Sequence, residues 1–358
     1  MGLIVYNDCK VLFFFLILQI YYAIPKPHPV MRISIIIPIY NIERYIVRCL
    51  DSVVSQGWET TECECIIVDD AGKDKSLEIA ERYVRDYHGP VCFRIERHRV
   101  NTGLSAARNT GLDNASGDYV FFLDGDDEIA PGGINRLVAL AKKYPGVDIV
   151  QGNIEIPHEK YQTLELSQYC DIEYTDDREW LRRNMFHNLP VTAWNKLTRL
   201  GFIKENGLRF KEGIIHEDNH WMLQMYRDIR SMAFCYTPTY IYHLNSDSIM
   251  ENRYKDRSYI SLLEIYSEFL PSIDRPDEQG KAVSEMARLY MHMERLENPD
   301  KFRKRYVEVF SQLLTLKNLN WYTRRACHYA IDRSKMTKRW SRIFCRPLYR
   351  LLKECDRL

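Results

Sequence analysis

The run Tyr119-Val-Phe-Phe-Leu123, followed at once by Asp124-Gly-Asp-Asp127, is the feature that most constrains how this chain folds. Five apolar or aromatic residues without a polar interruption predict a strand that is buried on both faces, as in a parallel sheet. Open α/β sheets bind their ligands at the carboxyl ends of their strands. The stretch therefore predicts a central strand whose carboxyl end carries a ligand site.

The acidic cluster after this strand has two competing interpretations. Three carboxylates within four positions repel one another unless a cation or hydrogen-bond donors lie between them, which indicates a hard divalent cation shared with phosphate oxygens. A solvated turn is the alternative, because Asp and Gly are common turn residues. A calcium loop is excluded, because it needs Gly and Glu where the chain has Ile129 and Asn135. Gly125 is expected to leave room for a turn and for a ligand.

Strand-like and helix-like patterns alternate along the first half of the chain, which predicts a parallel sheet with right-handed crossovers. The second expected strand also ends in acid, at Asp69-Asp70. The chain has no GxGxxG or complete P-loop motif, so a bound diphosphate would depend on a metal to offset the Asp charges. The first layer is expected to close near residue 156. The expected strands are 32–38, 65–68, 93–95, 119–123 and 149–156, and the expected helices are 46–56, 74–83 and 104–112.

A second group of polar residues follows between residues 157 and 250. Glu217 and Asp218 precede an expected helix over 219–230, where the helix dipole favours anions, and taken alone they are explained more simply by ordinary N-capping. Tyr240–His243 is expected to be a strand that ends in His, and a single His is more often structural than a metal ligand. Arg108, on the helix over 104–112, is either presented near the strand ends or solvated.

The two ends of the chain differ in character from its centre. Val11–Ile24 is strongly apolar but short for a membrane span, so residues 1–30 are interpreted as an anchor or a mis-assigned start, with folding expected from Met31. Residues 251–358 are expected to be helical, with helices over 260–270, 281–296 and 302–316. Arg342, Arg346 and Arg350 lie at helical spacing in a basic tail, which suits an anionic membrane surface or a docking helix.

Net charge and cysteine content restrict the class of protein. The formal net charge of the 358 residues is +1, so nothing in it indicates a nucleic-acid partner. The ten cysteines are irregularly spaced and form no CxxC pair, which excludes a zinc knuckle and favours a reducing, cytoplasmic compartment.

Six motifs in a fixed order resemble the family 2 glycosyltransferases with the GT-A fold, and more closely the bacterial enzymes that build surface polysaccharides. The resemblance covers residues 31–250 and implies an α/β fold with a Rossmann-like, mostly parallel sheet flanked by helices, followed by a helical C-terminal region. The chain has Ala71-Gly72 where many relatives have Gly-Ser. The motifs are Ser34–Asn41, Ile66–Asp70, Asn101–Asn109, Leu123–Asp127, Trp194–Lys196 and Glu217–Asp218.

The resemblance also implies a role for each matched residue. Asp218 would be the general base. Asp126, Asp127 and His243 would hold Mn²⁺ or Mg²⁺, with Asp126 also facing the ribose; the division of roles among the three acids varies in the family. Asp70 would hydrogen-bond the nucleobase and Arg108 would lie near the base or the diphosphate. The further substrate-binding residues implied are Pro38, Tyr40, Asn41, Asn101, Asp124, Trp194, Lys196 and Glu217.

The activity implied is metal-dependent transfer of a hexose, with inversion, from a nucleotide-sugar, expected to be a UDP-sugar, to a hydroxyl of a glycan or a lipid-linked acceptor. One base and one metal suffice for a single displacement. The enzyme would act at the cytoplasmic face of the cell membrane. A sugar nucleotidyltransferase or hydrolase, and a non-catalytic nucleotide-sugar-binding protein, are the alternatives.

Overall fold

The computed structural model describes residues 30–157, 165–245, 256–273, 275–289, 296–319 and 321–334. The apolar run over 11–24 and the basic tail with Arg342, Arg346 and Arg350 lie outside these residues. In the described part of the chain, no helix is both long enough and apolar enough to cross a membrane.

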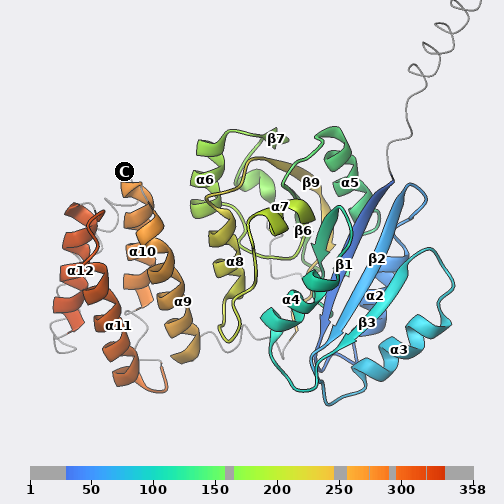
Figure 1. Cartoon of the computed structure of the whole chain (residues 1–358), viewed down its shortest axis with the longest axis horizontal. Coiled ribbons are helices and arrows are strands. Elements are labelled where there is room, and N and C mark those ends of the chain that lie inside the picture. The colour runs from blue at the N-terminus through green and yellow to red at the C-terminus, as the bar shows by residue number, and fades with distance from the viewer. Residues whose placement is uncertain are drawn as a thin grey trace, which may run out of the picture.

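One mixed sheet forms the centre of the molecule, in the order β3-β2-β1-β4-β8-β6-β9-β5, with β7 paired to β9. Parallel ladders join β3, β2, β1 and β4, and also β6 and β9, whereas β8 is antiparallel to both β4 and β6. Figure 1 shows the parallel half at the right and the helices that flank it. The strands are β1 (Met31–Ile39), β2 (Thr61–Asp69), β3 (Cys92–Arg97), β4 (Tyr119–Phe122), β5 (Glu128–Ile129), β6 (Ile149–Glu155), β7 (Tyr174–Thr175), β8 (Lys196–Arg199) and β9 (Met232–Ile241).

The sheet is buried on both faces, as the unbroken apolar run predicted. Alternate residues of β1 and β4 enter different cores: Ile35 and Phe121 pack on one face, and Ile36 and Phe122 on the other. The α-helices in this part are α2 (Ile46–Val54), α3 (Ser76–Asp86), α4 (Leu104–Asn114), α5 (Gly133–Lys143), α6 (Arg178–His187), α7 (Leu200–Glu205) and α8 (Glu217–Met225), with a 3₁₀ turn at Leu166–Gln168.

Helix α4 lies unusually close to β1. A Cβ atom on Gly111 would come within 2.3 Å of Ile36 Cγ2, so only glycine fits at this position. The close approach brings the first turns of α4, with Arg108, over the carboxyl end of the central strands.

Three expectations about the sheet and its following helix differ from the structure. The first layer does not close near residue 156, because β8 inserts between β4 and β6 and β9 extends the sheet further. The expected strand over 240–243 is only partly correct, because β9 begins at Met232 and ends at Ile241, so residues 242 and 243 lie beyond it. The expected helix over 219–230 begins at Glu217 and ends at Met225. Pairing between segments so distant in sequence is set by tertiary contacts, which local patterns do not record.

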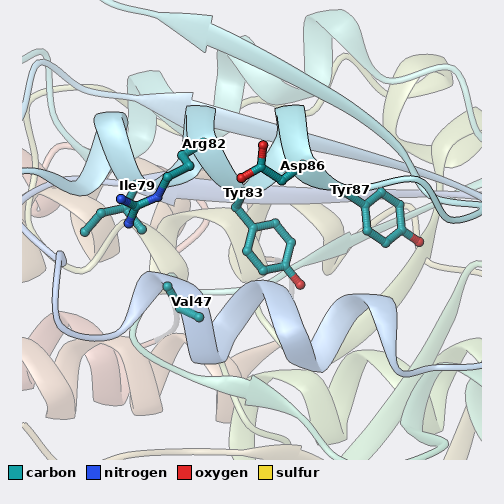
Figure 2. Close-up of a pocket in the computed structure, with 6 residues that line it drawn as sticks. All are labelled: Val47, Ile79, Arg82, Tyr83, Asp86 and Tyr87. Carbon is teal, nitrogen blue, oxygen red and sulfur yellow. The ribbon is translucent and has the colours of Figure 1, made fainter.

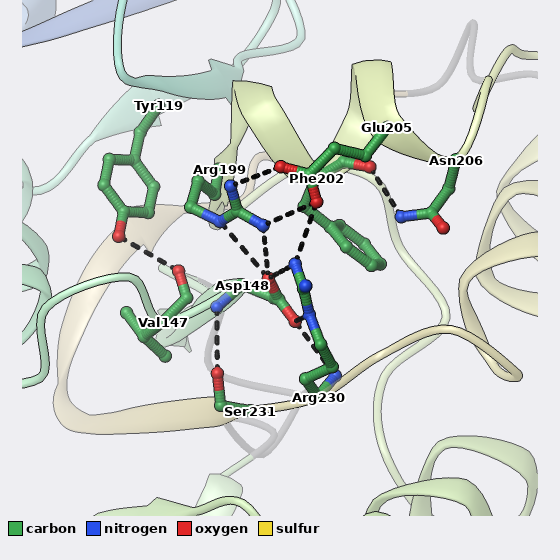
Figure 3. Close-up of polar contacts among 9 residues, drawn as sticks. All are labelled: Tyr119, Val147, Asp148, Arg199, Phe202, Glu205, Asn206, Arg230 and Ser231. Carbon is green, nitrogen blue, oxygen red and sulfur yellow. Dashed lines mark hydrogen bonds and ion pairs between the residues drawn. The ribbon is translucent and has the colours of Figure 1, made fainter.

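Asp148 lies directly before β6 and links neighbouring strands at the end of the sheet away from the acidic motif (Figure 3). Its carboxylate is 1% exposed and accepts hydrogen bonds from Arg199 Nη2 at 2.9 Å and from the Arg230 backbone N–H at 2.9 Å. Glu205 bonds the same two guanidinium groups from a half-exposed position. Because Arg199 ends β8 and Arg230 precedes β9, this cluster fixes both strands beside β6.

Residues 256–334 contribute helices with a core of their own, at the left of Figure 1. Helical structure was expected here, but a separate helix over 321–334 was not. Pro276 and Pro299 open two of the helices, where a missing N–H costs no hydrogen bond. The helices are α9 (Asp256–Phe269), α10 (Pro276–Leu289), α11 (Pro299–Leu313) and α12 (Trp321–Ser334), with a 3₁₀ turn at Leu270–Ser272.

Candidate active site

Arg108 is the centre of the site and joins parts of the chain that are more than a hundred residues apart. One of its terminal nitrogens bonds Asp124 Oδ1 at 2.8 Å, and the other bonds Glu217 Oε1 at 3.0 Å and Asp218 Oδ1 at 2.9 Å. The side chain is 1% exposed, so the solvated alternative is excluded. Burial opposes the charged form, but the carboxylates of Asp124, Asp218 and Glu217 raise the pKa of Arg108 above its ordinary value.

The aromatic rings of Phe210 and Phe122 surround the guanidinium of Arg108. Its central carbon lies 5.2 Å from the Phe210 ring centre and 6.0 Å from the Phe122 ring centre. The Nε–H of Arg108 is buried and donates no hydrogen bond to any of the described residues. The cation is therefore held by carboxylates on one side and by aromatic faces on the other.

The three acids of the motif have different environments. Asp124 is 25% exposed in its side chain and pairs with Arg108. Asp126 accepts a hydrogen bond from Asn245 Nδ2 at 2.8 Å, and burial and the charge of Asp124 raise its pKa. Asp127 is buried and accepts hydrogen bonds from the Tyr240 hydroxyl and the His243 backbone N–H, each at 2.8 Å.

Burial, together with the charges of Asp124 and Asp126, raises the pKa of Asp127 to about 8. Within the described residues, no three His, Cys, Asp or Glu side chains form a ready-made metal cluster. Asp124 Oδ2 accepts no hydrogen bond from that part of the chain, since Arg108 bonds the other oxygen of Asp124. Hard carboxylate oxygens that raise one another's pKa fit Mn²⁺ or Mg²⁺, and Mg²⁺ sites often take only one or two carboxylates and complete their coordination with phosphate and water.

Gly125 is explained by packing rather than by a ligand. A Cβ atom at this position would lie 2.3 Å from Ile42 Cδ1 and 3.1 Å from the Pro38 carbonyl oxygen. The space that the sequence assigned to a ligand is thus filled by the end of β1 and the residues that follow it. This contact fixes the acidic motif against Pro38.

Asp70 is held at the start of α4. Its Oδ1 accepts hydrogen bonds from the Thr102 N–H at 2.8 Å and from His98 Nδ1 at 2.7 Å, and its Oδ2 accepts one from the Gly103 N–H at 2.7 Å. Asn101 lies exposed in the same loop. Asp70 Oδ2 keeps one acceptor position beyond the Gly103 bond, because a carboxylate oxygen has two lone pairs.

The turn after β1 and the turn after β2 bond each other. Asn41 has φ +53° and its Oδ1 accepts a hydrogen bond from the Lys73 N–H at 2.8 Å, while Tyr40 is 43% exposed. Ala71 stands with φ +55° at the place where many relatives have glycine, so the backbone adopts the left-handed conformation without it. The turn that carries Tyr40 and Asn41 therefore lies against the turn that follows Asp70.

Trp194 and Lys196 approach the site from the start of β8. The Trp194 ring stacks on Tyr240, with ring centres 4.6 Å apart, and the Tyr240 hydroxyl bonds Asp127. Lys196 is fully buried and its amine donates to the backbone oxygen and hydroxyl of Thr192. Burial lowers the pKa of Lys196 to about 7, and the nearby charge of Asp218 opposes this shift.

Glu217 and Asp218 are the first residues of α8, and their carboxyl groups bond Arg108. Burial and the charge of Asp218 raise the pKa of Glu217 to about 7. Burial also raises the pKa of Asp218, while the Arg108 guanidinium works against that rise. A buried carboxylate with a raised pKa is suited to take a proton near neutral pH.

The ring of His243 is directed to a partner that the sequence did not anticipate. Its Nε2 lies 2.7 Å from Glu128 Oε1, which also pairs with Arg48 Nε at 3.1 Å. Only the backbone N–H of His243 contacts the expected metal ligand Asp127. In the described residues, His243 therefore supports the acidic motif through its backbone and Glu128 through its ring.

Several residues that support the site carried no readable signal in the sequence. Arg48 donates to the Asp126 carbonyl oxygen at 2.7 Å, and His98 and Thr102 hold Asp70. Arg48 lies on an ordinary amphipathic helix, where nothing distinguishes it from a surface cation. Tyr240 was within the expected strand before His243, but only the fold shows its hydroxyl between Asp124 and Asp127.

A cleft of about 280 Å³ lies elsewhere, between α2 and α3 (Figure 2). It contains none of the residues that the sequence predicted for the site. Its lining residues are Val47, Ile79, Arg82, Tyr83, Asp86 and Tyr87.

The family model described as glycosyl transferase family 2 matches residues 34–204, which include the acidic motif and Arg108. Residues 34–204 therefore form a glycosyl transferase family 2 domain. Members of this family are enzymes of the transferase class. The fold of the chain is GT-A. The resemblance that the six motifs carried is confirmed.

Relatives and solved structures agree with this assignment. The uncharacterised glycosyltransferase YibD of Escherichia coli is 28% identical over 223 residues, which are 61% of this chain and 63% of YibD. The structure of Staphylococcus aureus TarS residues 1–349 with UDP-GlcNAc superimposes with a TM-score of 0.63 and 20% identity, over 91% of this chain and 92% of that one. The mannosyltransferase PcManGT of Pyrobaculum calidifontis, in complex with GDP-Man and Mn²⁺, has a TM-score of 0.52 and 15% identity over 96% of this chain and 94% of that one.

At these identities, the two solved structures establish the fold of this chain and nothing finer. The chain spans 63% of the length of YibD and 39% of the length of full TarS. The substrates of those proteins therefore bear on this chain only as support for a proposal.

Proposed function

We propose that the protein is an inverting, metal-dependent glycosyltransferase that moves a hexose from a UDP-sugar to a hydroxyl of a glycan or lipid-linked acceptor in surface polysaccharide synthesis. The single observation that carries the proposal is the bonding of Arg108 to Asp124, Glu217 and Asp218. One buried cation connects the acidic motif, where a donor diphosphate would bind, to the residue that matches the general base.

Asp218 takes the proton of the acceptor hydroxyl as the new glycosidic bond forms. Its raised pKa supports this role, because a base works best when its pKa is close to the working pH. Arg108 keeps the Asp218 carboxyl directed at the reacting centre. Inversion follows from a single displacement, in which the acceptor oxygen attacks the anomeric carbon as the nucleotide leaves.

Asp126 and Asp127 hold Mn²⁺ or Mg²⁺, and Asp124 remains with Arg108. When bound, the cation offsets the negative charge that develops on the leaving diphosphate. His243 is retained as a candidate ligand only if its ring leaves Glu128, to which it bonds in this structure. The Mn²⁺ in the complex of PcManGT supports a metal in this fold.

The donor is proposed to lie along the carboxyl ends of β1 and β2. Pro38, Tyr40 and Asn41 line the nucleoside, and the free acceptor position of Asp70 receives an N–H of the base. Asn101, Trp194, Lys196 and Glu217 complete the expected substrate-binding set. TarS was solved with UDP-GlcNAc, which supports a uridine nucleotide.

The proposed acceptor follows from the name of a relative, and the proposed location from the charge of the C-terminal residues. TarS is named a poly(ribitol-phosphate) β-N-acetylglucosaminyltransferase, so the acceptor named for at least one relative is a polymer. Eleven Lys or Arg against three Asp or Glu over residues 324–357 would favour an anionic membrane. We place the protein at the cytoplasmic face of the cell membrane.

A donor screen tests the proposal. The chain is incubated with Mn²⁺ and a panel of UDP-, GDP- and TDP-sugars, and nucleotide release is followed with and without lipid-linked acceptors. Release of UDP that requires the metal and rises with an acceptor is the expected result. Donor loss without any acceptor, or pyrophosphate exchange, would favour the hydrolase or nucleotidyltransferase instead.

The same assay tests the base. Asp218→Asn should lower the turnover number by about 10²- to 10⁴-fold while donor affinity stays nearly unchanged. Asp228→Asn, the same substitution just after α8 and outside the Arg108 cluster, is the matched control and should keep full activity. Retained turnover with lost donor binding in Asp218→Asn would overturn the role.

A further inference from the structure

His216, the residue directly before Glu217 and Asp218, has a strained backbone. Its φ and ψ are +65° and +38°, in the left-handed region that a residue with a side chain seldom adopts. Such a conformation costs about 1 kcal/mol or more and persists only where neighbouring structure holds it. The strain lies at the point where the chain turns into α8, so it sets the direction in which both carboxyl groups leave the helix.

Local capping does not hold this turn. His216 is the N-cap residue of α8, and its side chain forms no capping hydrogen bond to the helix. N-capping by Glu217 or Asp218, the alternative considered from the sequence, is replaced by their bonds to Arg108. The support for the left-handed turn must therefore come from another element.

Helix α9 provides that support. The Ser258 hydroxyl lies 2.6 Å from His216 Nε2, and the Ser261 hydroxyl accepts a hydrogen bond from the Ile215 N–H at 3.2 Å. Both serines are buried, at 1% and 4% exposure. Arg257, beside them, donates to the Gly213 carbonyl oxygen at 2.9 Å. Gly213, Ile215 and His216, which precede the proposed base, are thus each bonded to a residue of α9.

Other contacts keep α9 in place against α8. Glu268, near the end of α9, pairs with Lys211 and lies 3.4 Å from His220 Nε2 on α8. Burial lowers the pKa of His216, which favours a neutral ring that forms one directed bond to Ser258. Because Ser258 is 1% exposed, its hydroxyl faces His216 and not a bound substrate.

We propose that Ser258 and His216 are a positioning pair for Asp218, so that the C-terminal helices are a working part of the active site. Ser258 keeps His216 in its left-handed conformation, and His216 directs the start of α8 so that Asp218 meets Arg108. The inference rests on the proposed function only in assigning Asp218 as the base. It gives a role to a region in which the sequence shows no motif.

The test compares Ser258→Ala with Ser267→Ala. Ser267 lies on the same helix, and among the described residues its hydroxyl bonds only the Glu264 carbonyl oxygen of that helix, so it is a matched control. For Ser258→Ala we expect a turnover number lowered by about 10- to 100-fold, because small displacements of a catalytic group are costly. The KM for the donor should stay within about twofold, since β1, β2 and α4 are untouched.

Backbone hydrogen exchange at residues 215–218 is the second readout and needs no activity. It should rise in Ser258→Ala and stay at the wild-type level in Ser267→Ala. His216→Asn tests the pair from the other side, because Asn tolerates the left-handed region but does not reproduce the imidazole bond to Ser258. It should show the same loss of turnover and the same rise in exchange.

Wild-type turnover and wild-type exchange in Ser258→Ala would overturn the proposal. A rise in donor KM that parallels the loss of turnover would also overturn it, because that pattern indicates general loosening. If the wild-type protein transfers no sugar from any donor, the proposed function fails, and the exchange measurement still decides whether Ser258 holds the loop.

Discussion

Replacing Arg108 by Met should destabilise the fold more than any surface substitution of an arginine. The guanidinium is 1% exposed and bonds three carboxylates at 2.8–3.0 Å. Removing one partner of a buried ion pair costs about 3–5 kcal/mol. Asp124 is a quarter exposed and keeps part of its hydration, which limits the cost. We therefore expect a loss of about 4 kcal/mol at neutral pH.

The loss should depend on pH with a defined sign. Burial already holds the pKa of Glu217 at about 7, and Arg108 lowers the pKa of Glu217 and Asp218. Without Arg108 the pKa values of Glu217 and Asp218 rise further above those of the unfolded chain. The folded variant then binds more protons than the unfolded chain over a wider range of pH. Stability then increases as pH falls through those raised values, and the deficit should shrink by about 2 kcal/mol between about pH 7.5 and pH 6.

Urea unfolding followed by tryptophan fluorescence measures this loss. With a slope of about 3 kcal/mol per molar, a loss of 4 kcal/mol lowers the midpoint by about 1.3 M. Arg209→Met is the matched control, since Arg209 pairs with Asp113 through both terminal nitrogens but is nearly half exposed, and it should lose less than about 1 kcal/mol. Equal losses in the two variants, or a deficit that grows as pH falls, would refute the reasoning.

Two further outcomes are expected. Asp148→Asn should lower the free energy of unfolding by about 3 kcal/mol, because it leaves Arg199 without its buried partner. Glu205→Gln removes a half-exposed carboxylate from the same arginines and should lower it by less than about 1 kcal/mol. Equal melting temperatures of the two variants would contradict this. Asp127→Ala should raise the Mn²⁺ concentration for half-maximal transfer at least about 10-fold, and chelation should stop transfer in the wild-type protein; an unchanged metal requirement would count against Asp127 as a ligand.

The sequence predicted the first half of the fold well for a physical reason. Parallel strands that are covered on both faces need unbroken apolar runs, and β1, β2 and β4 have them, so each was located within a few residues. The acids that follow β2 and β4 could be expected to lie near one another, because the carboxyl ends of parallel strands lie on the same side of the sheet. β8 was missed, because its Lys196-Leu-Thr-Arg199 pattern is short and mixed and its place depends on β4 and β6.

The candidate site could be predicted as residues but not as contacts. The motifs named Arg108, Asp124, Glu217 and Asp218, and the fold brings all four together. That Arg108 is the shared partner could not be read, because an arginine on a short helix looks the same whether it is solvated or buried. For His243 the predicted contact differs from the observed one. The resemblance implied that its ring binds a metal, but in the structure the ring bonds Glu128.

The sequence by itself determined which segments are buried strands, where the acids stand relative to them, and which family the chain resembles. These properties depend on residue type and on short spacing, which a linear chain carries directly. Only the tertiary structure decided that β8 enters the sheet, that one arginine joins three carboxylates, and that α9 supports the loop before Asp218 through Ser258 and Ser261. Such contacts join residues tens to more than a hundred positions apart, and their free energy comes from burial and hydrogen bonding that exist only once the chain has packed.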